Sequence, residues 1–148
     1  MTNIIILFAS ISCGFCIGRH LEKREKAKGL FFEHLIKYVS LLKTNVKSRR
    51  VELSKFNYEF SLSCSEHFAH YILLGKIPTF IGKSQQQLLL DFSQSLVANN
   101  SHELINNLDY YEQLVIAENN SISNSYRNRS VFSKLGVLLG VIVGILFM

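Results

Sequence analysis

The chain has little proline, no tryptophan and few charged residues. Pro78 is the only proline among 148 residues, and charged residues make up 18% of the sequence. Soluble domains typically carry about 25% charged residues. The three cysteines, Cys13, Cys16 and Cys64, are too few and too unevenly spaced for a disulfide framework, which indicates a reducing compartment. These shortages exclude a disulfide-stapled secreted module and a disordered tail, and the length excludes a large enzyme.

Charge is completely absent from two segments near the ends of the chain. Residues 4–18 read IIILFASISCGFCIG and residues 135–148 read LGVLLGVIVGILFM. Together with their flanking residues, helices formed by these two segments are long enough to span the ~30 Å hydrocarbon core of a bilayer. A signal peptide would need basic residues before the first segment, and none is present. A buried core helix is the alternative for the second segment. We predict transmembrane helices at residues 1–18 and 135–148, with a helical region at residues 19–134 between them.

Basic residues lie on the inner side of both segments and are absent from the outer side. They are Arg19, Lys23 and Arg24 after the first segment, and Arg127, Arg129 and Lys134 before the second. The positive-inside rule therefore predicts that residues 19–134 are cytoplasmic. The net charge of +5 and the sequence pI of about 9.2 are then explained by basic residues that lie beside anionic membrane lipid. Nucleic acid is therefore not an expected partner.

Small residues recur every four positions in both apolar segments. They are Ser10, Gly14 and Gly18 in the first segment, and Gly136, Gly140 and Gly144 in the second. Small residues at this spacing let helix backbones approach closely within lipid. The two faces have matching registers for an antiparallel pair. We predict that they pack against each other or against a partner helix.

Between the two segments the apolar spacing is helical almost throughout, and no strand-like alternation of useful length occurs. The predicted core positions are Phe31, Phe32, Leu35, Val39, Leu42 and Val46; Leu53, Phe56 and Phe60; Phe68 and Ile72, with Cys64 as a further candidate; Leu88, Phe92 and Leu96; and Leu104, Leu108, Tyr111, Val115, Ile122 and Tyr126. The fold class is therefore all-α. We predict a bundle whose first and last helices continue into the terminal apolar segments.

Helix boundaries in this region have their own signals. Gly75, Pro78 and Gly82 predict a break in the helical pattern. Ser84, three residues before Gln87, resembles a capping box that opens a helix over residues 85–97. Asn100 and Glu103 repeat the capping pattern, and the last helix is predicted to start at Ser101.

Three short patterns resemble chemical sites, but each has a simpler interpretation. IPTFIGKS at residues 77–84 lacks the glycine that a phosphate-binding loop needs where Ile77 stands. Cys64, His67 and His70 have the spacing of metal ligands, but each three-residue step advances about 300° around a helix, so the outer two diverge. A half-buried cysteine with two surface histidines is favoured. Cys13 and Cys16 form a CxxC pattern that packing within lipid explains better than redox chemistry.

The long last helix carries a polar face beside Tyr110 and Tyr111. Its members are Glu112, Glu118, Asn119, Asn120 and Asn124. A solvated face is the simpler interpretation, and a docking surface for another protein is the alternative. Nothing in the sequence resembles a catalytic dyad or triad. We predict no catalytic residue, no cofactor and no metal site.

The C-terminal half of the chain resembles the stage III sporulation protein AB family. The resemblance rests on LLLDFSQSL at residues 88–96, a short polar turn, a long uninterrupted helix and FSKLGVLLGVIVGILFM at residues 132–148. The first apolar segment, which ends at Gly18 and Arg19, fits as well. The chain departs from the family at Val97, where the family usually has glycine, and at residues 49–53, where it commonly has proline. It is also shorter in the middle, which is typical of a divergent member.

The resemblance implies a non-enzymatic subunit of the channel that links mother cell and forespore during endospore formation. The cytoplasmic region is then similar to that of the platform protein in type II secretion and type IV pilus machines. The implied location is the mother-cell membrane facing the forespore. The implied partners are stage III sporulation protein AA, a secretion-type ATPase, other channel subunits and a second copy of the chain. The alternative is a two-anchor helical scaffold or regulator of another bacterial envelope complex.

Overall fold

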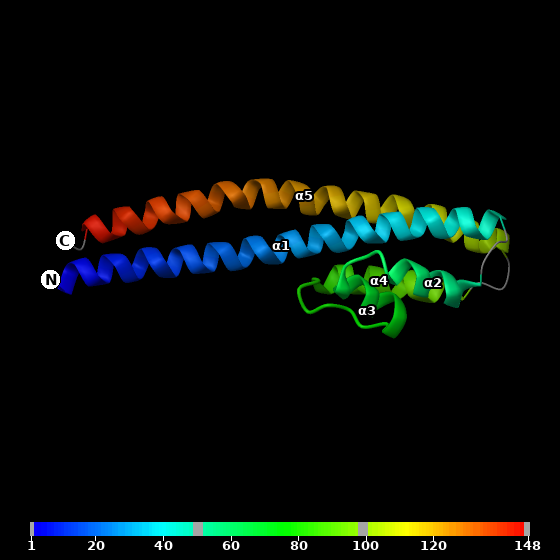
Figure 1. Ribbon diagram of the computed structural model, residues 1–148. Helices are drawn as coiled ribbons and strands as arrows, with labels where there is room; N and C mark the ends of the chain where they lie inside the picture. Colours follow the sequence, from blue (N-terminus) through cyan, green and yellow to red (C-terminus); the bar gives the residue numbers. More distant parts are fainter. Residues whose placement is uncertain (1, 49–51, 98–100, 147–148) are drawn as a thin grey trace. The chain divides into compact units, whose positions relative to one another are not determined.

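The computed structural model describes residues 2–48, 52–97 and 101–146, and these residues contain helices and no strand. The helices are α1 (Thr2–Ser48), α2 (Leu53–Ser61), α3 (Glu66–Leu74), α4 (Lys83–Ser95) and α5 (Ser101–Leu146) (Figure 1). The prediction of an all-α helical bundle is confirmed. The chain divides into two compact units. One is the bundle unit, Lys28–Asn120, and the other is the terminal unit, which holds α1 up to Ala27 and α5 from Ser121 onward.

The core of the bundle unit is rich in aromatic side chains. Phe31 and Tyr38 of α1 and Phe68 of α3 are each at most 1% exposed. The ring of Phe68 lies 5.2 Å from that of Phe31 and 5.9 Å from that of Tyr38, both in edge-to-face arrangements. Such pairs add to the stability that apolar burial supplies. In both long helices the predicted apolar stripe is the buried one, with Leu35, Val39 and Leu42 in α1 and Leu108, Val115 and Ile122 in α5.

The short helices bury different faces from those that the spacing predicts. In α4 the buried side chains are Leu89 and Phe92, whereas Leu88 and Leu96 are half-buried. In α3 the buried partner of Phe68 is Tyr71, and Ile72 is half-buried. A run of adjacent apolar residues offers several possible faces to a helix, so the neighbouring helices determine which one is buried.

The loop around Pro78 separates α3 from α4, as predicted. Gly75 ends α3 in the left-handed conformation, with φ 67°, which favours glycine. Helix α4 begins earlier than predicted, and Gly82, not Ser84, is its N-cap. The Oε1 of Gln85 accepts a hydrogen bond from the Gly82 amide at 3.0 Å, which satisfies a free donor at the start of the helix. The Asn100 cap lies outside the described residues.

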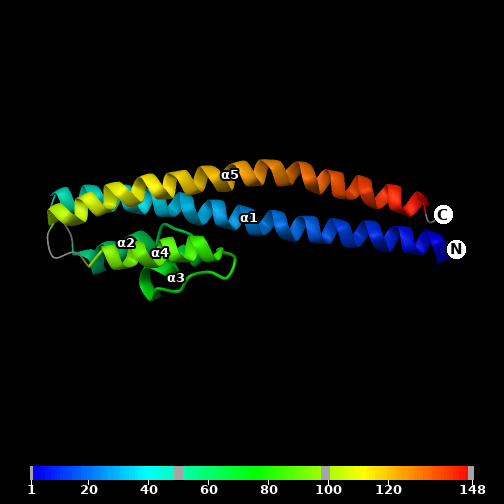
Figure 2. The same ribbon diagram turned by 180° about the vertical axis from the view of Figure 1, so that it is seen from behind.

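In the terminal unit, the two stretches of α1 and α5 run antiparallel and side by side in both views (Figures 1 and 2). Glu25 is 5% exposed although basic residues surround it in the sequence. The hydroxyl of Tyr126 donates to Oε1 of Glu22 at 3.2 Å, which ties the two helices together. Among the residues that the structure describes, no helix combines the length and the apolar character needed to cross a membrane.

Candidate functional site

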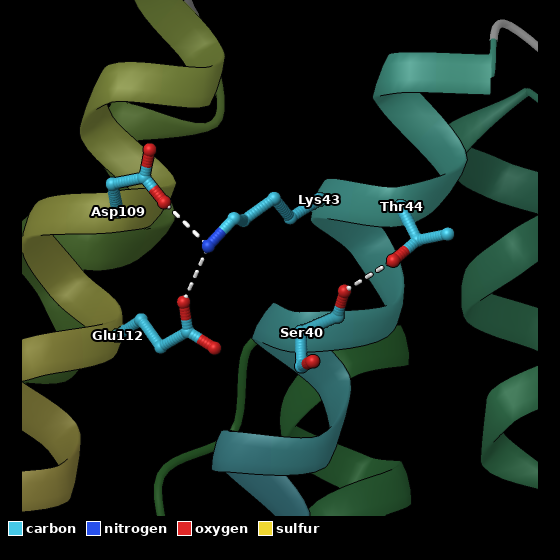
Figure 3. A network of polar contacts seen from close by, with 5 residues as sticks. All are labelled: Ser40, Lys43, Thr44, Asp109 and Glu112. Carbon is cyan, nitrogen blue, oxygen red and sulfur yellow. Dashed lines mark hydrogen bonds and ion pairs between the residues drawn. The ribbon is translucent and has the colours of Figure 1, made fainter.

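An ion pair joins the two long helices within the bundle unit. The Nζ of Lys43 in α1 lies 2.5 Å from Oδ1 of Asp109 and 2.7 Å from Oε2 of Glu112, both in α5 (Figure 3). Asp109 and Glu112 are three residues apart, so both carboxylates lie on the same side of α5. Figure 3 shows the Lys43 side chain reaching between them. Hydrogen bonds from Lys43 lower the pKa of Asp109, and those to Asp109 and Glu112 raise the pKa of Lys43.

Local hydrogen bonding beside this ion pair stays within α1. The hydroxyl of Thr44 donates to the main-chain oxygen of Ser40 at 3.1 Å (Figure 3). Both residues are exposed. This side of α1 therefore faces solvent, and the contact with α5 lies on the Lys43 side.

A second polar contact joins α4 to α5. The Nε2 of Gln85 donates to Oε1 of Glu118 at 2.7 Å. Nearby, the rings of Phe92 and Tyr111 lie 5.5 Å apart in an edge-to-face arrangement. The prediction that Glu112 and Glu118 belong to a solvated face is therefore wrong. Both lie beside the buried stripe of α5, where a long acidic side chain reaches the next helix.

The exposed side of α5 between residues 106 and 120 is mostly polar and carries one charged residue, Asp109, whose side chain is 50% exposed. The other exposed residues are Asn106, Tyr110, Gln113, Ala117 and Asn120. Tyr110 is 61% exposed. Asn119, which the sequence also assigns to the polar face, is half-buried. Asp109 and Glu112 contact Lys43, and Glu118 contacts Gln85, while Asp109 also remains exposed to solvent.

Two more polar contacts hold α1 against α2 and α3. The Nδ1 of His34 accepts a hydrogen bond from the Ser65 amide at 3.3 Å and lies 3.1 Å from the Ser65 hydroxyl. Burial, with a smaller contribution from Lys37, lowers the pKa of His34, so the neutral ring that accepts this bond is favoured. The buried hydroxyl of Tyr38 donates to Oδ1 of Asn57 at 2.7 Å.

Sequence reasoning does not find His34, Lys43 or Gln85. Each lies next to apolar core positions in a helix, and nothing in the neighbouring sequence distinguishes it from other polar residues. Their partners are 31 to 69 residues away along the chain, so the contacts arise from tertiary packing. No local pattern could have indicated them.

The patterns that resemble chemical sites have ordinary surroundings. The thiol of Cys64 is half-buried and donates to the Ser61 carbonyl at 3.6 Å, whereas His67 and His70 are exposed. In the described part of the chain, no three His, Cys, Asp or Glu side chains are grouped so that they could hold a metal ion. Lys83 and Ser84 form the exposed first turn of α4.

Most of the predicted helix-packing residues lie where side chains are not described. Gly18 is half-buried in α1, and the exposure of the other five, Ser10, Gly14, Gly136, Gly140 and Gly144, is not described. Of the predicted basic residues, Arg19, Lys23 and Arg24 are exposed on α1. The side chains of Arg127, Arg129 and Lys134 are not described. Both sets therefore remain predictions, as do the two membrane anchors.

Comparison of the chain with protein-family models, with curated proteins and with solved structures finds no match.

Proposed function

We propose that the chain is a non-enzymatic membrane platform subunit of the sporulation channel between mother cell and forespore. In this proposal the two apolar segments anchor it in the mother-cell membrane facing the forespore. The helical bundle lies in the cytoplasm and docks a secretion-type ATPase of the stage III sporulation protein AA kind.

The observation that carries the proposal is the unbroken course of the two long helices. Helix α1 extends from Thr2 to Ser48 and α5 from Ser101 to Leu146. Each helix therefore contains both a charge-free terminal segment and one side of the bundle core. A direct chain connection of this kind suits a subunit that holds a cytoplasmic partner beside a membrane.

The polar side chains of the bundle also suit a structural role. Lys43, Glu118 and Tyr38 each contact a residue of another helix. These contacts fix the helices against one another, and a docking platform needs such a fixed surface.

Accessibility labelling of single cysteines tests the membrane topology. Cys13, Cys16 and Cys64 are first replaced by serine. A cysteine added at either terminus should then react with an impermeant reagent outside intact cells, whereas Ser84→Cys should react only after permeabilisation. Ser84 is a suitable internal position because it is exposed and conservative to replace. Labelling of Ser84→Cys in intact cells would contradict the orientation and the ATPase contact.

Co-purification tests the partner. The tagged full chain from sporulating cells should retain the secretion-type ATPase, and a tagged unrelated protein with two membrane anchors serves as the control. Equal recovery of the ATPase with both proteins would contradict the docking role.

A further inference from the structure

A groove with a volume of about 590 Å³ lies on the surface of the bundle unit. Five of its lining residues belong to two turns of α1, and they are His34, Ile36, Lys37, Ser40 and Leu41. Phe60 of α2, Ser63 just after α2 and Glu112 of α5 complete the lining. The groove is open to solvent. Sites for small molecules enclose most of the ligand, so an open groove between helices suits a segment of another protein.

The two charged side chains that line this groove differ in their partners. Glu112 already forms an ion pair with Lys43 at 2.7 Å, and Figure 3 shows its second carboxylate oxygen on the side of Ser40. Lys37 is exposed and has no ion pair in the part of the chain that the structure describes, although Glu33 lies one turn away on α1. The charge of Lys37 is therefore available to an anionic group in the groove.

His34 supplies a hydrogen-bond donor beside this charge. Its Nδ1 accepts a hydrogen bond from the Ser65 amide at 3.3 Å, so the proton of the neutral ring lies on Nε2. Among the described residues, this Nε2 has no hydrogen-bond partner. His34 and Lys37 are three residues apart and are therefore neighbours on the surface of α1. Together they offer two donors to a carboxylate.

Apolar surface lies one turn further along α1. Leu41 follows Lys37 by four residues, and its side chain is 52% exposed. Phe60 of α2 lines the same groove. The groove therefore presents an apolar surface next to the two donors, and a complementary partner carries a large apolar side chain within about one helical turn of a carboxylate.

We propose that this groove docks a helical segment of a partner protein, with a carboxylate of the segment at His34 and Lys37 and an apolar side chain at Leu41 and Phe60. The inference rests on the proposed function, in which the bundle docks a cytoplasmic protein. It adds the surface that makes the contact and the chemistry of the segment that fits it.

Photochemical cross-linking of the full chain in sporulating cells tests the place of the contact. The photoreactive residue p-benzoylphenylalanine replaces Leu41, and the segment that it captures is sequenced by mass spectrometry. Leu90 is the matched control, because it is a leucine of the same bundle unit that is 47% exposed and does not line the groove. The Leu41 position should capture a protein segment with a carboxylate within about one helical turn of a large apolar residue. Equal capture at both positions, or capture of lipid or of a second copy at Leu41, would overturn the proposal.

Reversal of one charge tests the chemistry of the contact. Lys37→Glu places a carboxylate beside that of the segment and should reduce the yield of the Leu41 cross-link by about tenfold. Lys83→Glu is the control, because Lys83 is exposed on α4 outside the groove, and it should leave the yield unchanged. Lysine in place of the acidic residue of the captured segment should restore the yield with Lys37→Glu. Equal yields from the two lysine variants would contradict the proposal.

The identity of the captured segment separates this inference from the proposed function. A segment of the secretion-type ATPase that passes the charge-reversal test supports both. A segment of another protein that passes the same test supports the groove and contradicts the ATPase as the partner. Co-purification of the ATPase without a cross-link at Leu41 would support the proposed function and overturn the groove as the docking surface.

Discussion

Tyr71 illustrates how single residues place polar atoms inside this bundle. The residue is 5% exposed, and its hydroxyl lies 2.9 Å from both the Leu89 carbonyl oxygen and the Ser93 hydroxyl. Burial raises its pKa to about 12, with the Ser93 hydrogen bond acting in the opposite direction. A buried hydroxyl needs such partners, because an unsatisfied polar group is costly. Tyr71 therefore links α3 to α4 by a polar contact as well as by packing.

Replacing Tyr71 by phenylalanine should lower the free energy of unfolding by about 1 kcal/mol, which is typical of one lost hydrogen bond. Tyr110→Phe is the matched control. Its ring is 61% exposed, so its stability should equal that of the original chain. Urea unfolding of both variants measures the difference. Equal stability of the two variants would show that the Tyr71 hydroxyl contributes nothing to the fold.

His34 makes the stability of the bundle depend on pH. Its pKa in the folded protein lies below the ordinary value of 6.5, chiefly because of burial and also because of Lys37. Between these two pKa values the unfolded chain binds more protons than the folded one. The stabilising contribution is therefore present above pH 6.5 and is lost as the pH falls through the lowered value.

The variant His34→Asn should reduce this dependence, because asparagine offers an acceptor near the Nδ1 position that does not titrate in this range. The measurement is the thermal midpoint of both proteins at a series of pH values from neutral to mildly acidic. The midpoint of the original chain should fall more steeply. Parallel curves would mean that His34 is not the titrating group.

At the scale of elements, α4 shows how neighbouring helices select the buried face. Residues 88–90 are all leucine, so the helical period alone allows any of the three to face the core. Leu89 is fully buried, whereas Leu90 is 47% exposed. Phe92 is the other buried residue of α4. Its ring centre lies 6.3 Å from that of Tyr38 in α1 and 5.5 Å from that of Tyr111 in α5. These contacts, with the hydrogen bonds from Tyr71 of α3, orient α4.

This orientation predicts unequal effects for adjacent residues. Leu89→Ala should lower the free energy of unfolding by about 3 kcal/mol, because it leaves a cavity in the core. Leu90→Ala, with the same chemical change one position along, should cost about 0.5 kcal/mol or less. Chemical denaturation measures both. A larger loss for Leu90→Ala would show that α4 buries another face.

At the scale of the whole molecule, the two long helices determine what the terminal segments can do. Their terminal stretches lie side by side and antiparallel in the terminal unit (Figures 1 and 2). An antiparallel pair is the arrangement in which the predicted small-residue faces, Gly14 and Gly18 with Gly136 and Gly140, have matching registers. If these faces pack within a membrane, a branched side chain should separate the helices.

Gly140→Ile should therefore remain in the membrane fraction but weaken assembly by about 0.6–2 kcal/mol, the range measured for contacts between membrane helices. Leu139→Ile, one position along the helix, should have little effect. Spore formation by cells that carry each variant provides the readout. Equal sporulation would mean that Gly140 faces lipid and that the segment is a plain anchor.

Much of the fold could be predicted because its signals are local. The apolar stripes of α1 and α5 and the break around Pro78 follow from helical periodicity and from the backbone limits of proline and glycine. The start of α4 does not follow from the local pattern, because Gln85 and not Ser84 supplies the capping bond.

The candidate site was less predictable, because its contacts join distant parts of the chain. The sequence places Glu112 and Glu118 on a polar face, but their partners Lys43 and Gln85 come from other helices. No spacing within α5 could have shown where the charges point.

Helical content, the apolar stripes and the charge-free terminal segments are properties of neighbouring residues, so they follow from composition and periodicity alone. The choice of Leu89 among three leucines and the pairing of Lys43 with Asp109 and Glu112 depend on how the helices pack. Packing decides these features because a helix offers several faces of similar chemistry, and only contact with other helices makes one face more stable than the rest.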